Sequence, residues 1–232
     1  MMDDFNLYQR QWDLLNTQDL QDVSVTVVGC GSVGSVATMT LLKMGLRNVQ
    51  LFDDDRISQE NLPNQFLPDM VGEPKVFGLE SLLSKLGLYE YCNARFEKWT
   101  GQRLETPVVI SAADDMEVRR ALFAACVRTF GLVKLFIDVR SAGEYMKVYA
   151  VDPSREAGRK FYISTLHTNA QSEPADCMAS QIIYSSLFAG GLAAQRVKQW
   201  VKDERVPQFT TYAVGLNKMF DDNVFWNRGK VA

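Results

Sequence analysis

Short apolar runs alternate with amphipathic stretches along most of the chain. The β-branched run at 23–29 predicts a strand, and Ser32 to Met44 predicts a helix that Gly45 ends. The alternation continues with strands expected at 49–52, 108–111, 133–139 and 144–151, and helices expected at 75–86 and 116–128. Such alternation predicts an α/β fold, in which a mostly parallel sheet carries helices on both faces.

The N-terminal region shows a helical pattern, and a later region breaks the alternation. Residues 1–20 are expected to form an N-terminal helix, because Phe5, Tyr8, Trp12 and Leu15 recur at spacings of three and four. Residues 152–180 are polar and contain two prolines, which indicates a long crossing loop.

The last part of the chain, 181–232, is expected to hold a helix and a hairpin. An apolar helix is predicted at 181–201, with Gly190 and Gly191 allowing close packing against another element. A strand pair should start at Phe209 and turn near Asp221-Asp222-Asn223. The whole chain, 1–232, is therefore interpreted as one domain with antiparallel additions toward the C-terminus.

Composition narrows the class of protein. The 232 residues are 47% hydrophobic and 23% charged, with a formal net charge of −3, which suits one globular domain and argues against nucleic acid as a partner. No run approaches the roughly 18 apolar residues of a membrane span, and the polar, acidic start does not resemble a secretory signal. We therefore expect a cytoplasmic protein without a membrane partner.

The cysteines do not form a recognisable framework. Cys30, Cys92, Cys126 and Cys177 are far apart and the chain has one histidine, His167, so the spacing argues against a structural zinc site or a disulfide scaffold.

A glycine-rich turn supplies the first chemical signal. Gly29, Gly31 and Gly34 have G-x-G-x-x-G spacing, after a predicted strand and at the start of a helix, where backbone N–H groups can face phosphates. Asp53 follows at the end of the next strand, where a ribose hydroxyl would need an acceptor. These features predict a nucleotide site on a Rossmann-like sheet. A nicotinamide-dependent dehydrogenase and a glycine turn without a ligand remain alternatives at this point.

Further motifs point away from a dehydrogenase. They are Tyr8-Gln9-Arg10-Gln11, Asp53-Asp54-Asp55, Asn61-Leu62, Gly72-x-Pro74-Lys75, and Asp114 with Arg119. In this order, from Tyr8 to the terminal hairpin, the chain resembles the ThiF/MoeB/HesA family, the adenylating core that the ubiquitin-activating enzymes share.

The resemblance implies a reaction and its partners. It implies ATP and Mg²⁺ as cofactors, and adenylation of the C-terminal carboxylate of a ubiquitin-like or sulfur-carrier protein that ends in glycine. It also implies a homodimer, since Arg10 matches an arginine finger that acts across the dimer interface.

The resemblance also assigns residue roles. Lys75 is expected to contact the phosphates and Asp114 to help bind Mg²⁺, which prefers one or two carboxylates together with phosphate oxygens. The other nucleotide-site residues that it implies, besides the three glycines and Asp53, are Asp55, Asn61 and Asn64. Structural alternatives are a solvated helix start for Lys75, a helix N-cap for Asp114 and a surface position for Arg10.

One position departs from the family pattern. Family members commonly carry an arginine where this chain has Asn64, and asparagine lacks the charge and the bidentate donors of arginine. Arg56 could replace that arginine. Otherwise the chain could adenylate slowly, or it could be a pseudo-enzyme subunit that needs an active partner. Adenylation of a peptide or a tRNA is another alternative within the family.

Cys177 is the candidate nucleophile in the crossing loop. It lies in the polar segment Glu173–Ala179 before the apolar helix, where relatives that proceed beyond adenylation carry a cysteine that takes the acyl group as a thioester or handles sulfur. His167 could assist it. Arg140 and Glu144 could contact an incoming protein tail or form a surface ion pair.

Overall fold

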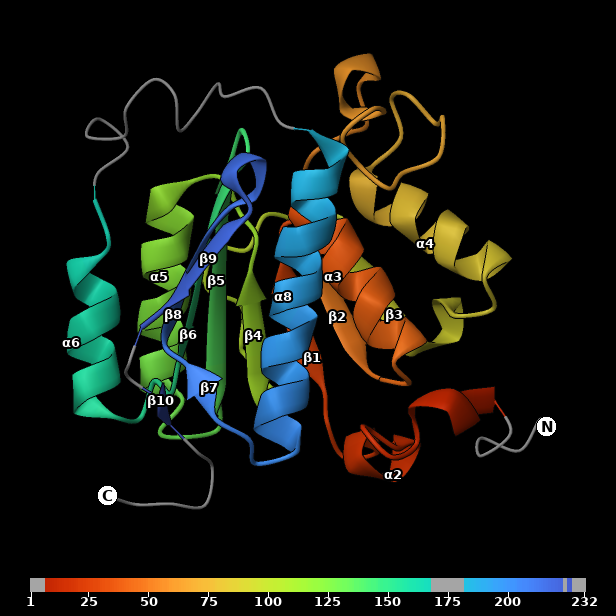
Figure 1. Ribbon diagram of the computed structural model, residues 1–232. Coiled ribbons are helices and arrows are strands. Elements are labelled where there is room, and N and C mark those ends of the chain that lie inside the picture. The colour runs from red at the N-terminus through yellow and green to blue at the C-terminus, as the bar shows by residue number, and fades with distance from the viewer. Residues whose placement is uncertain (1–6, 168–181, 223–224, 227–232) are drawn as a thin grey trace.

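An eight-stranded sheet forms the centre of the molecule (Figure 1). The computed structural model describes residues 7–167, 182–222 and 225–226. The strands lie in the order β3 (Cys92–Arg95), β2 (Val49–Phe52), β1 (Val25–Val28), β4 (Val108–Ser111), β5 (Leu135–Ala142), β6 (Tyr145–Val151), β8 (Phe209–Ala213) and β9 (Lys218–Asp221).

Strand direction divides the sheet into two parts. β3, β2, β1, β4 and β5 are parallel to their neighbours, whereas β6, β8 and β9 are antiparallel. The predicted fold class is confirmed, including the antiparallel additions toward the C-terminus. The strand order reverses between β1 and β4, which is the switch point where open α/β sheets bind ligands.

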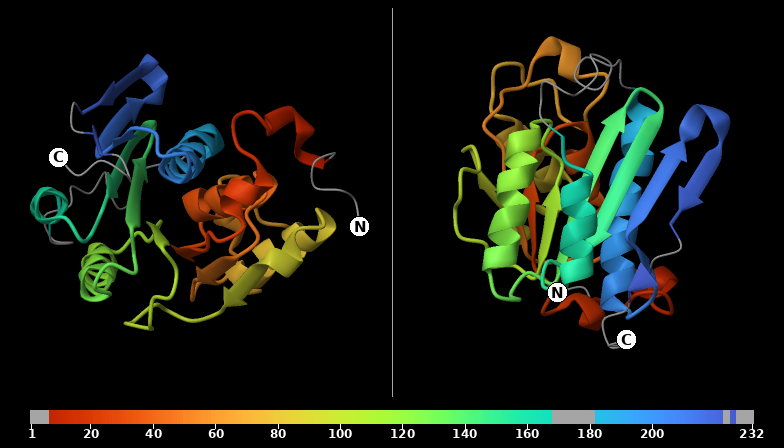
Figure 2. Two further views of the ribbon diagram at one scale, coloured as in Figure 1. Left: turned by 90° about the horizontal axis from the view of Figure 1, so that it is seen from below. Right: turned by 90° about the vertical axis from the view of Figure 1, so that its left-hand side faces the viewer.

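Helices cover both faces of the sheet, as Figures 1 and 2 show. α3 (Ser32–Lys43), α4 (Lys75–Lys85) and α8 (Ile183–Val201) share one hydrophobic core with the sheet. α5 (Met116–Arg128) and α6 (Glu156–Ser164) share a second core on the opposite face. The remaining described elements are short: η1 (Gln9–Gln11), α2 (Thr17–Leu20), η2 (Gln59–Asn61), η3 (Tyr89–Tyr91), η5 (Val214–Leu216), and β7 (Val206–Pro207), which pairs with β10 (Phe225–Trp226).

The expected close packing around Gly190 is confirmed. A Cβ atom at Gly190 would lie 2.6 Å from Cγ1 of Val36, so only glycine lets α8 approach α3 this closely. α8 therefore packs directly against α3, the helix that follows the glycine turn. No helix in the described ranges is long and apolar enough to cross a membrane.

The single N-terminal helix was a wrong prediction. Only its second part can be assessed, and there η1 and α2 are separate. Asn16 starts α2 with a capping box, in which its side chain accepts from the N–H of Asp19 while Asp19 accepts from the N–H of Asn16. The apolar periodicity hid this new helix start.

The crossing loop was also predicted too long. α6 lies inside 152–180 because Tyr162 is fully buried in the second core, against the rings of Phe123 and Phe136. Residues 168–181, including Cys177, lie outside the described residues.

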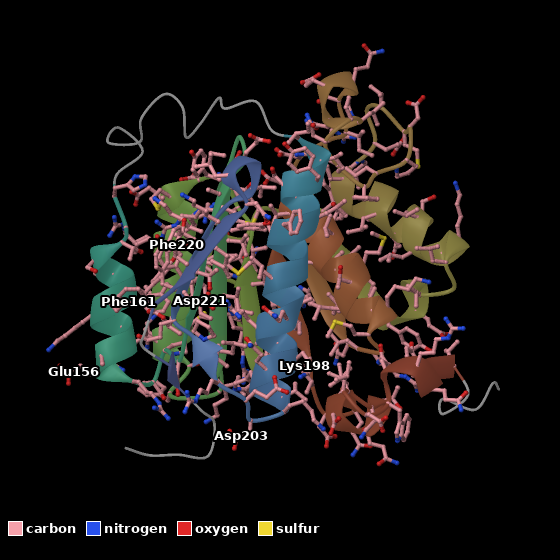
Figure 3. The ribbon with its side chains drawn as sticks, viewed as in Figure 1. Glu156, Phe161, Lys198, Asp203, Phe220 and Asp221 are labelled. Atoms are coloured by element: carbon pink, nitrogen blue, oxygen red, sulfur yellow. The ribbon has the colours of Figure 1, made fainter. Side chains whose placement is uncertain are left out.

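The C-terminal hairpin exists, but its turn lies earlier than expected. β8 and β9 are joined at 214–217, where Asn217 adopts a left-handed conformation with φ 51°. Arg196 of α8 is buried beneath the hairpin and donates to Thr210 of β8. Its guanidinium also reaches Asp221 of β9, labelled in Figure 3, at 3.4 Å.

Candidate functional site at the carboxyl edge of the sheet

The glycine turn joins β1 to α3 at the switch point. A Cβ at Gly29 would lie 2.7 Å from the main chain of Ala112, and one at Gly34 would lie 1.8 Å from the carbonyl oxygen of Gly29. These two glycines are required for packing. Among the described residues, a Cβ at Gly31 would meet only the side-chain nitrogen of Gln65, at 3.7 Å, so this part of the chain leaves the start of α3 open to an approaching group. This arrangement suits an anion at a helix N-terminus.

Asp53 lies at the end of β2, beside the glycine turn. Its carboxylate accepts from the N–H of Cys30 at 2.5 Å and from the N–H of Asp55 at 2.8 Å. Burial is the main cause that raises the pKa of Asp53, and these two hydrogen bonds partly offset it. The structure thus brings Asp53 and the glycine turn together, as the sequence predicted.

Lys75 begins α4 and points back toward the end of β2. Its side chain is buried, and its ammonium lies 2.6 Å from the carboxylate of Asp55. The alternative of a solvated helix start is therefore wrong. Lys75, Asp53 and Asp55 form one cluster next to the glycine turn.

Asn61 and Asn64 lie on the loop that joins β2 to α4. Asn61 ends η2, and the N–H of Asn64 donates to the carbonyl of Asn61 at 3.0 Å. Arg56, the suggested replacement for the family arginine, donates to the carbonyl of Gly72 at 2.7 Å and lies over the ring of Phe96. The guanidinium of Arg56 is thus bound at the β3 side of the sheet. Arg56 therefore does not take the place of the family arginine that is missing at Asn64.

Gln65 is a site residue that sequence reasoning missed. Its side-chain nitrogen faces the open side of Gly31, and its side-chain oxygen is buried without a hydrogen-bond partner among the described residues. Its position directly after Asn64 was the available signal, but no local pattern indicates that it folds over the glycine turn.

Asp114 follows β4 on the other side of the switch point. It is exposed, and its carboxylate has no hydrogen-bond or ion-pair partner among the described residues. Asp115, not Asp114, caps α5, by accepting from the N–H of Glu117 at 2.8 Å. The alternative role of Asp114 as an N-cap is therefore wrong.

The carboxylates present at the site are compatible with the ligands that Mg²⁺ prefers. The described residues include no group of three or more potential metal ligands, so a cage made of protein atoms is not formed there. A single uncommitted carboxylate such as Asp114 suits a cation that takes its other ligands from phosphates and water.

Arg10 is not brought to this edge. Its neighbour Gln11 donates to the carbonyl of Met44, at 2.7 Å, and the ring of Tyr8 lies against Gly45. Both contacts are at the end of α3, whose 12 residues span about 18 Å from the glycine turn. The exposed Arg10 thus lies at the opposite edge of its own sheet.

A buried charge network lies at the end of β5 and was missed by sequence reasoning. The fully buried carboxylate of Asp138 accepts from Arg119, from Arg140 at 2.8 Å and from the hydroxyl of Tyr162 at 3.0 Å. Arg140 also donates to the carbonyl and hydroxyl of Thr165 at the end of α6. Arg140 thus connects β5 to the end of α6 and does not form a surface ion pair with Glu144.

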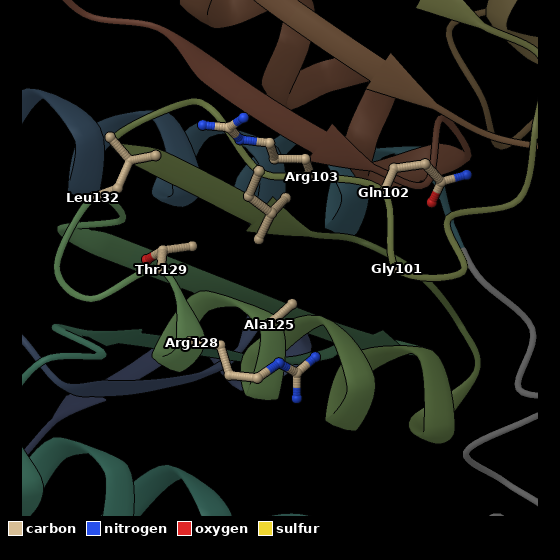
Figure 4. Close-up of a pocket in the computed structure, with 8 residues that line it drawn as sticks. Gly101, Gln102, Arg103, Ala125, Arg128, Thr129 and Leu132 are labelled. Atoms are coloured by element: carbon tan, nitrogen blue, oxygen red, sulfur yellow. The ribbon is translucent and has the colours of Figure 1, made fainter.

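Two further cavities are present in the described part of the chain. One of about 300 Å³ lies between residues 101–104 and the C-terminal part of α5, and Arg103, Arg128 and Leu132 are among the residues that line it (Figure 4). The other, of about 430 Å³, is a groove on α8 that is lined by residues including Leu187, Phe188 and Gly191. Neither cavity contains a predicted site residue.

The fold and the grouping at its carboxyl edge define a Rossmann-like α/β protein with a candidate nucleotide site. A model of the ThiF family matches residues 6–230, so the chain belongs to the ThiF family.

Curated relatives agree with this family. The molybdopterin-synthase adenylyltransferase of Salmonella typhimurium is 32% identical over 124 residues, which cover 50% of each chain. The sulfur carrier protein ThiS adenylyltransferase of Escherichia coli is 30% identical over 136 residues, which cover 53% of this chain and 54% of that one. The ubiquitin-like modifier-activating enzyme 5 of Dictyostelium discoideum is 27% identical over 132 residues, which cover 48% of this chain and 34% of that one. The aligned regions thus span about half of the curated relatives or less.

Solved structures share the fold. Escherichia coli MccB with ATP has a TM-score of 0.74 and 17% identity, with 97% of this chain and 73% of that chain covered. PaaA has a TM-score of 0.74 and 14% identity, with 97% of this chain and 75% of that chain covered. At these identities the likeness concerns the fold alone.

Proposed function

We propose that this chain binds ATP with Mg²⁺ and adenylates the C-terminal carboxylate of a ubiquitin-like or sulfur-carrier protein that ends in glycine. The observation that carries the proposal is the meeting of the open helix start at Gly31 with Asp53, Lys75 and Asp114 around one switch point. Family membership and the names of the aligned relatives support the same reaction class.

In the proposed reaction, a carboxylate oxygen of the substrate attacks the α-phosphorus of ATP. The bond to the bridging oxygen breaks, pyrophosphate leaves with the electron pair, and an acyl adenylate forms. Negative charge grows on the phosphoryl oxygens, so cations must face it.

The chain's own residues divide this work. The main-chain N–H groups near Gly31 and the ammonium of Lys75 attract the phosphates, and Asp53 accepts from the ribose. Asn61 and Asn64 line the phosphate side of the site. Asp114 would hold Mg²⁺, which supplies charge neutralisation at the phosphates when it is bound.

Cys177 provides the second stage of the proposal. Its thiolate attacks the acyl carbon of the adenylate, AMP leaves with the bonding electrons, and a thioester forms. The buried Cys30 and Cys126 and the half-buried Cys92 do not suit this role, because desolvation raises the pKa of each thiol.

A homodimer belongs to the same proposal. Arg10 lies about one length of α3 from its own glycine turn, so a catalytic role for its guanidinium requires the site of a second chain. Mixing Arg10→Ala with Asp114→Ala chains tests this arrangement. Recovery of about a quarter of the sites supports sharing between subunits, because only one site of a mixed dimer then has both groups. No recovery contradicts it.

The main test is ATP–pyrophosphate exchange with ubiquitin-like proteins that bear a free C-terminal glycine. Exchange should require the tail and should be lost in Asp114→Ala. Glu105→Ala is the control, since it removes an exposed carboxylate on a loop without predicted site residues. Exchange that persists in Asp114→Ala contradicts the assigned role. MgATP binding without exchange, for every tail tested, contradicts the proposed substrate class.

A second candidate function is a catalytically weak partner subunit. Asn64 in place of the family arginine, together with the engagement of Arg56 by Gly72, favours this candidate. Failure of the wild-type chain to bind MgATP would support it.

A further inference from the structure

A short main-chain ladder sets the position of Lys75. The N–H of Ile57 donates to the carbonyl of Glu73 and the N–H of Gly72 donates to the carbonyl of Ile57, each at 2.8 Å. The N–H of Lys75 then donates to the carbonyl of Asp55 at 2.9 Å. These main-chain hydrogen bonds alone place Lys75 beside the acidic end of β2, independently of its side chain.

The side chains add a second connection between the same two residues. The ammonium of Lys75 lies 2.6 Å from the Asp55 carboxylate, with the lysine side chain 10% exposed and the aspartate side chain 63% exposed. A lysine has a long and flexible stem, so one fixed partner decides where its charge rests. Asp55 thus holds Lys75 by both its main chain and its side chain.

The held ammonium lies close to the residues that border the glycine turn, since its partner Asp55 donates its N–H to Asp53. Its charge acts on the Asp53 carboxylate and on the Cys30 thiol, where it opposes the rise in pKa that burial causes. Asp53 itself accepts from the N–H of Cys30. Asp55 therefore holds the charge of Lys75 beside the carboxylate that contacts the glycine turn.

We propose that Asp55 is a positioning residue, which fixes the ammonium of Lys75 for the phosphates and does not itself contact the nucleotide. This inference rests on the proposed function, because it takes MgATP as the ligand. It also distinguishes Asp55 from Asp54, which is exposed and has no side-chain partner among the described residues.

Asp55 could act as a nearby negative charge or as a positioning residue, and these two roles predict opposite effects on MgATP binding when the carboxylate is removed. Removing a negative charge near a polyanion should tighten its binding. Loss of a positioning contact should weaken binding, because Lys75 then samples other conformations. Asp54→Asn is the matched control, since it removes the same charge one residue away without touching Lys75.

The measurement is the Kd of MgATP by calorimetry. We expect Asp55→Asn to weaken binding roughly tenfold, the equivalent of one charge-assisted hydrogen bond, while Asp54→Asn leaves it unchanged or tighter. Asp55→Glu should recover part of the loss. In a Lys75→Met background Asp55→Asn should cause no further weakening, which is the non-additivity expected of residues that act through one another.

Other outcomes overturn the inference. Equal effects of the two asparagine variants show that Asp55 acts through charge only. Full weakening by Asp55→Asn in the Lys75→Met background assigns Asp55 a direct nucleotide contact. If the wild-type chain does not bind MgATP, the proposed function fails first and this inference fails with it, whereas the other two outcomes leave the proposed function standing.

Discussion

The carboxylate of Asp53 accepts a hydrogen bond from the main-chain N–H of Cys30, which ties the end of β2 to the glycine turn. The position of this carboxylate has a favourable and an unfavourable effect on stability. It fixes the turn and offers an acceptor toward the nucleotide site, yet its burial disfavours the charged form and raises its pKa.

The raised pKa of Asp53 predicts how stability depends on pH. Between the ordinary value of 3.8 and the higher folded value, the folded chain binds the proton more readily than the unfolded chain, so stability should fall as pH rises. We expect wild type to gain free energy of unfolding relative to Asp53→Asn on acidification. A tenfold difference in proton affinity between the folded and unfolded chains corresponds to about 1.4 kcal/mol. Urea unfolding over a pH series measures this. Parallel profiles for the two proteins would refute it, and Asp54→Asn is the control.

Two glycines of the turn should separate folding from binding. Gly34→Ala places a Cβ 1.8 Å from a carbonyl oxygen and should lower the thermal midpoint strongly or prevent folding. Gly31→Ala meets only the flexible side chain of Gln65 and should fold nearly as well as wild type. Its methyl group should nevertheless obstruct phosphate and weaken MgATP binding by roughly tenfold or more. Calorimetry on folded Gly31→Ala tests this, and unchanged affinity would show that phosphate does not approach there.

The network around Asp138 should be important for stability. Asp138→Ala leaves the guanidinium groups of Arg119 and Arg140 without their buried carboxylate, and we expect a loss of about 3–5 kcal/mol in the free energy of unfolding. Tyr162→Phe removes one hydrogen bond to Asp138 and should lose only about 1 kcal/mol. Urea denaturation compares the two. Similar midpoints for Asp138→Ala and wild type would mean that the arginines find other partners.

The cysteines should differ in reactivity. Burial raises the pKa of Cys92 to about 12 and raises the pKa of Cys30 and Cys126 strongly, so these thiols should stay protonated and unreactive at pH 8. Iodoacetamide should therefore label Cys177 first in the native protein, as mass spectrometry can show. Unfolded protein, in which all four should react, is the control. Labelling of Cys30 at the rate of Cys177 would remove the basis for assigning Cys177 the nucleophilic role.

Local patterns were sufficient where structure depends on neighbours in sequence. The strand, glycine turn and helix from Val25 to Lys43 follow from β-branched residues, glycine spacing and a C-terminal glycine, which all act within a few residues. Asp53 could also be placed, because it follows the next predicted strand, β2, which lies parallel to β1.

Non-local contacts explain what was missed. Arg119, Asp138 and Tyr162 are separated by 19 and 24 residues, and only the packing of α5 and α6 on the same face brings them together. α6 itself was hidden by its polar surroundings, since the burial of Tyr162 is a tertiary effect. The break before α2 was predictable, because Asn16 and Asp19 have the spacing of a capping box.

In the proposed dimer, the placement of Arg10 at the far end of α3 makes catalysis depend on concentration. If its guanidinium completes the site of a neighbouring chain, each site is complete only while two chains are associated. Activity per chain should then fall on dilution below the dissociation constant of the pair, even though every chain stays folded and binds nucleotide. An excess of an inactive chain that still carries Arg10 should restore the activity of dilute Arg10→Ala chains, so that the two proteins behave as an enzyme and its activator.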